Sequence, residues 1–242
     1  MFSSIWHNFF FDPVYNSLVF FIDIIPGGDV GLAIIATVLL VKTILLPISI
    51  KAVKTQKIMR EIEPKLKEIK EKHKEDKQVQ AQAMMAVYRD AGMNPFASIL
   101  LVLLQIPIII ALYFSVSTGG GVSLPDINVD LLYSFIAEPT AVTMDFIGLV
   151  DINGRSLFLA LAAGVTQYIH VTLTMPKLAP KEPGAEPNFK DDFMRNMQTQ
   201  MKYVMPVLIT VVAYTISAAI ALYFLVSNLT SIAQEYFVRK HR

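Results

Sequence analysis

The 242-residue sequence contains no cysteine, which excludes disulfides, cysteine-based zinc sites and thiol chemistry. It also lacks a Gly-rich phosphate loop, an HExxH metal motif and a GxSxG nucleophile elbow. The four histidines are scattered too widely along the chain to suggest a metal site. No basic stretch precedes the first apolar residues, so we expect no cleavable secretory signal. The sequence therefore predicts no enzymatic activity, no cofactor and no metal.

Charged residues are scarce, at 17% of the chain, whereas hydrophobic residues make up 54% and the mean hydropathy is +0.50. This composition is typical of a polytopic helical membrane protein. Nineteen of the 21 Lys and Arg fall in residues 51–93, 177–202 and 239–242, and eight acidic residues fall in the segments between Asp12 and Asp151 outside 51–93. By the positive-inside rule, the basic segments are cytoplasmic.

We predict an all-α fold with five transmembrane helices, the N-terminus outside and the C-terminus in the cytoplasm. The apolar run 203–233 is too long for one span, and a hairpin with its turn near residues 215–218 keeps both flanking basic segments inside. The expected segments are an outer interfacial amphipathic helix at 1–29, spans at 30–52, 94–117, 156–176, 202–215 and 217–238, a cytoplasmic helical hairpin at 53–93, an outer loop at 118–155, a cytoplasmic loop at 177–201 and a cytoplasmic tail at 239–242.

Lys42 lies near the middle of the first predicted span. A lysine at that depth costs about 2.5–3.5 kcal/mol on insertion scales, so such a residue usually faces a bundle interior or a watery cavity and marks a functional site. The alternative is that the ammonium group extends along the helix to the lipid headgroups. The sequence favours the cavity.

Polar residues also interrupt the second and third predicted spans. Gln105 and Pro107 fall near the centre of the second, where the proline leaves a backbone carbonyl without its helical partner. Gln105 either satisfies that carbonyl or lines a cavity. The third span carries polar residues at helical spacing, which face either other helices or water: Thr166, Gln167, His170 and Thr174.

The hairpin segment has an apolar stripe beside many basic side chains. Ile58, Ile62, Leu66 and Ile69 recur at spacings of three and four, and eleven Lys or Arg lie between residues 51 and 89. The basic face suits an anionic membrane surface or RNA, although a charged face that merely contacts solvent is an equally simple reading of any single lysine.

Several of these features together resemble the YidC/Oxa/Alb membrane protein insertases over nearly the whole chain. The motifs are a lysine-bearing first span that ends in ILLP with Pro47, the segment MNPFASILLVLLQIPI with Asn94, Pro95, Gln105 and Pro107, and the segment LYFLVSNLTSIAQ with Ser227 and Asn228. The resemblance is to the compact bacterial form without a large periplasmic domain.

The resemblance implies a groove that opens to the cytoplasm and the lipid and is closed on the outer side. A basic residue of the first span, often arginine, lies in that groove in the family, and Lys42 matches its position. Arginine can bind a carboxylate through two hydrogen bonds and stays charged when buried, whereas lysine is a single point charge that loses its proton more readily when desolvated. The groove must therefore contain water if Lys42 is to stay cationic. Gln105, Gln167, His170, Ser227 and Asn228 are the expected hydrogen-bonding groups of the groove.

The resemblance further implies a non-enzymatic insertase or chaperone of the bacterial plasma membrane that accepts nascent membrane proteins, alone or with a Sec-type translocon. Ribosomes and signal-recognition components are further candidate partners, with no role for DNA. Two other classes stay open on the residues alone. A small-solute or ion transporter would also use a buried lysine, and a non-inserting assembly factor would tolerate its loss.

Overall fold

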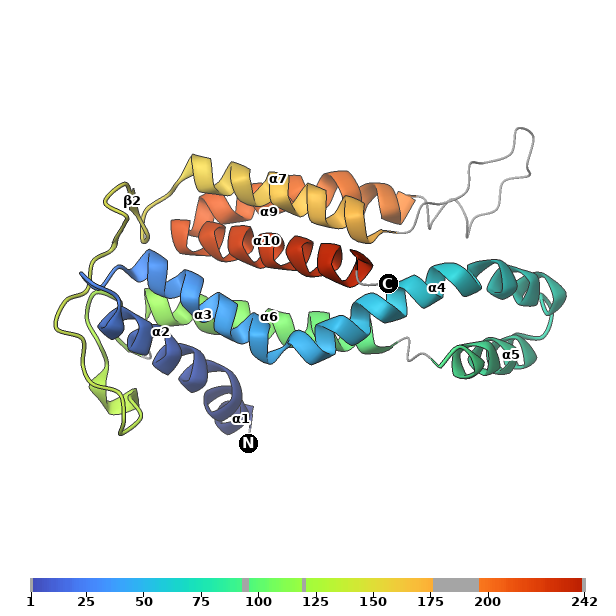
Figure 1. Cartoon of the computed structure of the whole chain (residues 1–242), viewed down its shortest axis with the longest axis horizontal. Helices are drawn as coiled ribbons and strands as arrows, with labels where there is room; N and C mark the ends of the chain where they lie inside the picture. The colour runs from blue at the N-terminus through green and yellow to red at the C-terminus, as the bar shows by residue number, and fades with distance from the viewer. Residues whose placement is uncertain (1, 93–95, 119–120, 176–195, 241–242) are drawn as a thin grey trace.

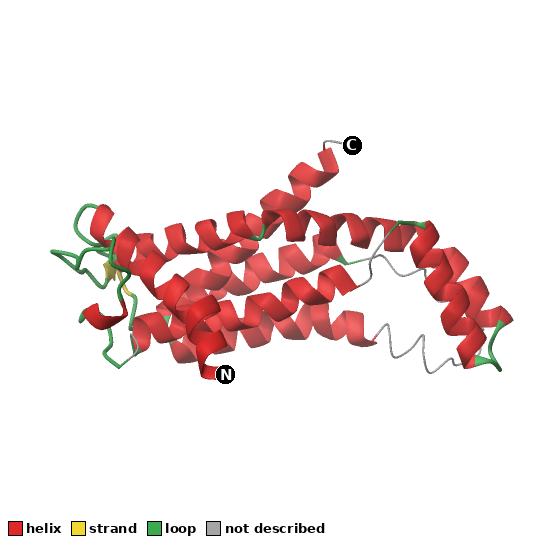
Figure 2. Cartoon of the chain, turned by 90° about the horizontal axis from the view of Figure 1, so that it is seen from below, coloured by secondary structure: helices red, strands yellow, loops and turns green. Residues whose placement is uncertain are grey.

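The computed structural model describes residues 2–92, 96–118, 121–175 and 196–240. The chain is mostly helical, which confirms the all-α prediction. Helices α3 (Val30–Ile44), α6 (Phe96–Ser117), α7 (Leu157–Thr174), α9 (Met205–Ile216) and α10 (Ala218–Lys240) run along one long axis (Figure 1). Seen from below, the only strands described lie at one end of this bundle (Figure 2).

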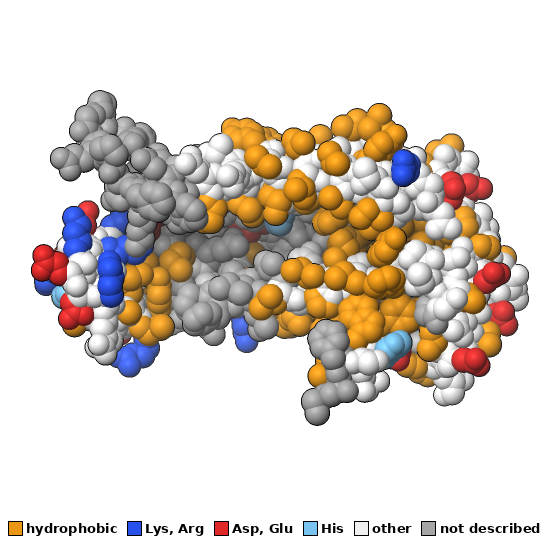
Figure 3. Space-filling model, turned by 180° about the vertical axis from the view of Figure 1, so that it is seen from behind, with side chains coloured by type: hydrophobic (Ala, Val, Ile, Leu, Met, Phe, Trp, Pro, Cys, Tyr) orange, Lys and Arg blue, Asp and Glu red, His pale blue; other side chains and the backbone are white. Residues whose placement is uncertain are grey.

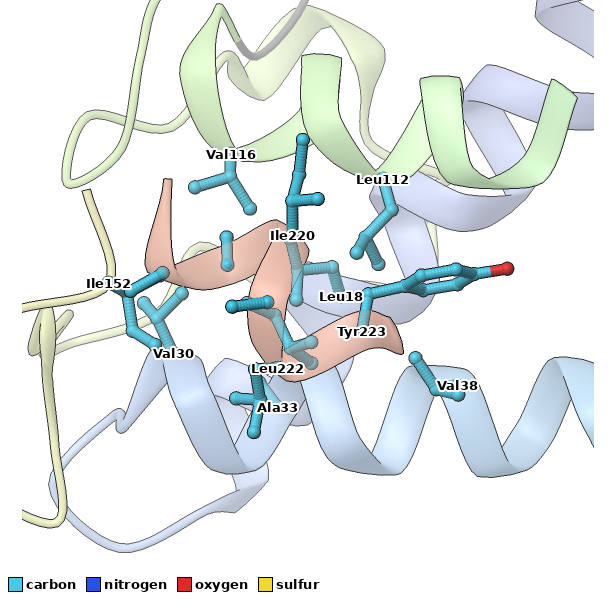
Figure 4. Close-up of a cluster of buried hydrophobic side chains, with 14 of the residues drawn as sticks. Leu18, Val30, Ala33, Val38, Leu112, Val116, Ile152, Ile220, Leu222 and Tyr223 are labelled. Carbon is cyan, nitrogen blue, oxygen red and sulfur yellow. The ribbon is translucent and has the colours of Figure 1, made fainter. Parts of the chain in front are cut away.

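The core of the bundle forms where α2 (Asp12–Ile24), α3, α6 and α10 meet (Figure 4). Leu18, Val30, Leu112 and Leu222 are at most 2% exposed. Alanines are abundant among the buried residues, and small side chains allow helix backbones to approach closely where lipid supplies no hydrophobic drive. The buried alanines of this cluster are Ala33, Ala111, Ala160, Ala213, Ala218, Ala219 and Ala221.

Helix occupies most of residues 1–29, the segment predicted to form an interfacial helix. The π-helical turn η1 (His7–Phe11) joins α1 (Phe2–Trp6) to α2, so helix runs through Pro13 without a break. One face of α2 is buried, which fits the amphipathic helix expected there. Its Asn16 is 1% exposed. That side chain accepts a hydrogen bond from the Tyr133 backbone and donates one to the Leu131 carbonyl.

The outer-loop segment packs onto the ends of the helices. It contains the short helix η2 (Val129–Leu131) and the strands β1 (Asp145–Phe146) and β2 (Val150–Asp151), which pair antiparallel. Leu124 and Ile152 from this segment are buried in the core cluster. The backbone amide of Ala218 donates to the carbonyl of Gly154, and that of Ala219 donates to Ile152. These bonds satisfy the first turn of α10 and tie the loop to the bundle.

The first predicted span does not end where the hairpin begins. Helix α3 bends by 63° into α4 (Leu46–Lys72), and α4 then continues as the first arm of the hairpin. Pro47 explains the bend, because it lacks an N–H and its ring clashes with the preceding turn. The expected division at residue 52 therefore falls inside one continuous helix.

The second arm of the hairpin is α5 (Lys77–Asp90), which packs against α4. Leu66 and Val87 are buried between the arms. Asp76 caps α5 by accepting from the Gln78 and Val79 amides, and Gln80 donates to the carbonyls of Lys70 and His73. Residues 73–76 form the turn between the arms.

Within the described residues, α7 is by itself long and apolar enough to cross a membrane, and the bent pair α3 and α4 forms a second candidate if counted as one span. The apolar part of α6 described there is Leu103–Ser117, and α9 has 12 residues. Figure 3 shows most of the Lys and Arg, interspersed with several acidic side chains, at the hairpin end, and mainly acidic side chains at the opposite end, with apolar surface between. The predicted cytoplasmic loop 177–201 lies largely outside the described residues, as does the end of the tail.

Candidate functional site: a polar cavity inside the bundle

A cavity of about 220 Å³ lies between α3, α4, α6, α7 and α10. Apolar side chains such as Val38 and Leu112 form part of its wall, and the same residues belong to the core cluster. That cluster also contains Leu124 and Ile152 of the predicted outer loop, so the core lies between the cavity and that segment. The polar or titratable lining residues are Thr37, Lys42, Ser49, Gln105, His170, Thr174, Tyr223, Ser231, Gln234 and Glu235.

Lys42 lies in the last turn of α3, just before the bend, and its ammonium group lines the cavity. Nζ donates a hydrogen bond of 3.0 Å to Oγ of Ser231 on α10. The Ser231 hydroxyl in turn donates to the Ser227 carbonyl at 2.9 Å. A buried ammonium is tolerated only where polar groups or water surround it, and the cavity provides them.

Gln105 reaches the same cavity from α6. Its Nε2 donates to Oγ of Ser227 at 3.0 Å. Ser227 is 3% exposed. Pro107 lies inside α6 two residues further on, where the helix continues. The Gln105 amide is thus directed across to α10.

The polar stripe of α7 divides between two environments. His170 and Thr174 line the cavity, whereas Thr166 is buried against α10. Nδ2 of Asn228 on α10 donates to the Ala163 carbonyl at 3.3 Å and to Oγ1 of Thr166 at 3.4 Å. Asn228 therefore joins two helices. Gln167 is half-buried and is not among the residues that line the cavity.

Four cavity residues of α10 were not identified from the sequence: Tyr223, Ser231, Gln234 and Glu235. Nε2 of Gln234 donates to Oγ of Ser49 on α4 at 2.6 Å. Glu235 is 5% exposed. The signal was available, because Ser227, Ser231 and Gln234 recur at spacings of four and three and so share one face of a helix.

The structural motif residues are described in part. Pro47 starts α4 at the bend and Pro107 lies within α6. Asn94 and Pro95 lie outside the described residues. Among the residues that the structure describes, no group of three or more His, Asp or Glu side chains is placed to hold a metal ion.

The fold and the cavity define a class: an all-α bundle with a wide apolar surface, opposite charges at its two ends, and a polar chamber that contains a lysine. The family model described as "60Kd inner membrane protein" matches residues 21–242. The chain therefore belongs to this family, whose curated relatives are YidC membrane protein insertases.

Curated relatives match most of the chain. "Membrane protein insertase YidC 2" of Bacillus anthracis is 28% identical over 241 residues, which is 98% of this chain and 82% of the relative. "Membrane protein insertase YidC" of Fusobacterium nucleatum is 30% identical over 213 residues, 88% of this chain and 87% of the relative. The Shewanella woodyi protein of the same name is 31% identical over 226 residues, which cover 93% of this chain and 36% of that longer protein.

Proposed function

We propose that this protein is a membrane protein insertase that takes newly synthesised membrane proteins into the Lys42 cavity and releases them sideways into the bilayer. The observation that carries the proposal is the cavity itself. It gathers Lys42, Gln105 and His170 from three helices inside a bundle whose outer surface is apolar. Membership of the YidC family supports the same reading.

The proposed topology has five membrane spans with the N-terminus outside and the C-terminus in the cytoplasm. The first span is α3 with the first part of α4, Leu46–Thr55, followed by α6 and α7, and the hairpin of α9 and α10 turns at Ser217. The basic hairpin then lies in the cytoplasm and the acidic loop segment outside, in agreement with the positive-inside rule. Helix α9 follows the π-helical turn η3 (Gln200–Val204) without a break, and the apolar stretch 203–216 is only about 21 Å long as a helix, so it would thin the bilayer beside it.

In the proposed mechanism, Lys42 attracts acidic or polar residues of a substrate's outer tail into the cavity. The Lys42–Ser231 and Gln105–Ser227 hydrogen bonds are exchangeable, so the substrate backbone can replace one partner in each. This replacement lowers the cost of desolvating the substrate's polar groups. His170 adds a further hydrogen-bonding group on the α7 side of the cavity. Transfer of the substrate's apolar segment into lipid then drives release.

Gln167 and Asn228 hold a different place in the proposal. Asn228 binds Ala163 and Thr166 of α7, so it fixes the spacing of the cavity wall. Gln167, the residue after Thr166 in α7, lies outside the cavity lining, and we propose that it contacts longer substrate segments. The α4–α5 hairpin is the proposed first contact for substrates or for ribosome, signal-recognition or Sec-type translocon components at the bacterial plasma membrane.

The test is reconstitution of the purified protein into liposomes with a freshly translated single-span substrate that bears an acidic outer tail. Protease protection of that tail measures insertion by wild type, Lys42→Ala and Lys42→Arg. We expect insertion by wild type and Lys42→Arg, and a level close to protein-free liposomes for Lys42→Ala. Equal insertion by all three would remove Lys42 from the mechanism. Failure of wild type across several substrates would favour a transporter or an assembly factor.

A further inference from the structure

The outer-loop segment contains a tight apolar turn at residues 147–149, between β1 and β2. Ile147 is 59% exposed and Leu149 is 80% exposed. Ile147 also has a φ of 46°, in the left-handed region that β-branched residues rarely adopt. Such backbone strain persists only where the surrounding contacts enforce it, and it is found most often at functional positions.

Each backbone amide of this turn has a hydrogen-bond partner within the protein. The Ile147 amide donates to Oδ2 of Asp29 at 2.7 Å. The Gly148 and Leu149 amides donate to the two carbonyls of β1, at 3.2 and 3.0 Å. Water can satisfy the amides of a solvated turn, whereas the hydrocarbon region of a bilayer offers no replacement for a missing partner. The turn thus combines exposed apolar side chains with satisfied amides, which suits surroundings that contain little water.

Two attachments hold the turn against the ends of α3 and α10. The second carboxylate oxygen of Asp29 accepts from the Leu32 amide at 2.9 Å and caps α3. After β2, the carbonyls of Ile152 and Gly154 accept from the amides of the first turn of α10, at 3.1 and 2.8 Å. The position of the turn therefore follows from the positions of these two helix ends (Figure 2).

The depth of those helix ends follows from the short helix α9. The apolar stretch 203–216 is about 21 Å long as a helix, against about 30 Å for a typical hydrocarbon core. The joint between α9 and α10 at Ser217 cannot extend far into water on the outer side, unless the bilayer thins to meet it. In both cases the segment that bonds to the start of α10 lies close to the outer lipid surface.

We propose that the turn 147–149 inserts its apolar side chains into the outer leaflet, at the boundary between headgroups and acyl chains. The inference rests on the topology given with the proposed function and adds a lipid-binding surface to it. Asp145 and Asp151 pair across the two strands and are both exposed, so the base of the turn stays among the hydrated headgroups. Only the tip leaves the water.

A lipid occupant also agrees with the neighbouring surface. Helix α7 begins at the same end of the bundle with Leu157 and Phe158, which are 57% and 76% exposed. These side chains start the apolar surface that the proposed topology places against acyl chains. Two large aliphatic side chains at the tip of the turn gain free energy when lipid removes them from water.

The experiment uses the full chain, which has no natural cysteine, in lipid nanodiscs. Leu149→Cys carries an environment-sensitive NBD fluorophore, and Glu138→Cys, exposed in the same outer-loop segment, is the matched control. Quenching is measured with phospholipids brominated near the headgroup end of their acyl chains and with aqueous iodide. For a tip about 5–10 Å deep, bromolipid should quench the Leu149→Cys probe at least about twofold more than the control, and iodide should quench it less.

Two results would overturn the inference. Iodide quenching equal to that of the control, without quenching by bromolipid, would place the turn in water. Protection from both quenchers would show that protein, such as a second copy of the chain, covers the turn in place of lipid. Neither measurement requires a substrate, so failure of the inference and failure of the proposed insertase function are separate outcomes.

Discussion

The amide group of Gln234 on α10 donates a hydrogen bond of 2.6 Å to the hydroxyl of Ser49 on α4. Three residues before Gln234 in α10, the hydroxyl of Ser231 accepts a hydrogen bond from the ammonium group of Lys42 on α3. One face of α10 is thus attached to the bent pair on both sides of the bend at Leu45. The cavity wall depends on these two polar contacts as well as on apolar packing.

The Ser49–Gln234 bond should be measurable as a coupling between the two side chains. We expect the single variants Ser49→Ala and Gln234→Ala, and the double variant, to give a coupling energy of about 0.6 kcal/mol and at most about 1.7 kcal/mol, the range found for hydrogen bonds between membrane helices. Unfolding in mixed detergent micelles provides the measurement. The control cycle pairs Gln234→Ala with Thr43→Ala, because the exposed Thr43 hydroxyl bonds locally to Leu39. Strict additivity of Ser49→Ala and Gln234→Ala would contradict the bond.

Asn16 should be needed to hold the outer segment on the bundle. Asn16→Leu keeps most of the volume but leaves the Tyr133 amide and the Leu131 carbonyl without their partner, so we expect a loss of about 1–3 kcal/mol in the free energy of unfolding. Limited proteolysis should also cut residues 121–155 faster. The neighbouring variant Ser17→Ala, which loses only a local bond to Pro13, should change neither measurement. Unchanged proteolysis of Asn16→Leu would show that apolar packing alone retains the loop.

Gly164 lies where α7 packs closely against α9. A Cβ at this position would overlap Oγ1 of Thr210 and press on the Pro206 carbonyl. Gly164→Ala should therefore lower stability by about 1–3 kcal/mol, as overpacking does elsewhere. Combining it with Thr210→Ala should restore part of the loss, whereas Val165→Ala on the exposed face should cost little. Thermal unfolding in detergent measures these changes in stability. If Gly164→Ala has no effect on stability, α7 and α9 lie further apart than described here.

The natural lack of cysteine makes the cavity accessible to single-cysteine labelling. We expect Ser231→Cys, in the cavity, to react with a membrane-impermeant maleimide added on the cytoplasmic side of inverted vesicles. Ala219→Cys, in the fully buried core between cavity and outer loop, should stay unlabelled from either side. Labelling of Ser231→Cys from the outer side would reverse the proposed direction of opening.

Much of the fold could be read from the sequence because apolar length and charge act over whole segments. The helices on either side of Ser217 end and begin within the four residues where the charge argument put a turn. The bend at Leu45 was not anticipated, since Pro47 was treated as the end of a span and not as the joint of two helices. A proline in the sequence predicts that a helix is interrupted there. The direction that the chain takes after the interruption depends on tertiary packing.

Less of the candidate site than of the fold can be predicted from the sequence. Lys42 draws attention because a charge within an apolar run is costly, and Gln105 because a neutral amide there is costly unless it is hydrogen-bonded. Glu235 lies near the end of its apolar run, where a charged residue costs little free energy. Composition alone therefore does not predict that it lines the cavity. Whether Asn228 or Gln167 faces the cavity is a matter of helix rotation by a fraction of a turn. Only the packing of α7 on α10 decides it.

The continuity of α4 has a mechanical consequence. Its 27 residues, with Pro64 inside the helix, extend about 40 Å from the cavity wall near Ser49 to the tip of the basic hairpin. A rotation of about 10° at the Leu45 joint would swing that tip by about 7 Å, and a load on the tip would act back on the wall with the same leverage. A tilt of α4 at the bend would therefore move the hairpin and the Ser49 side of the cavity wall together.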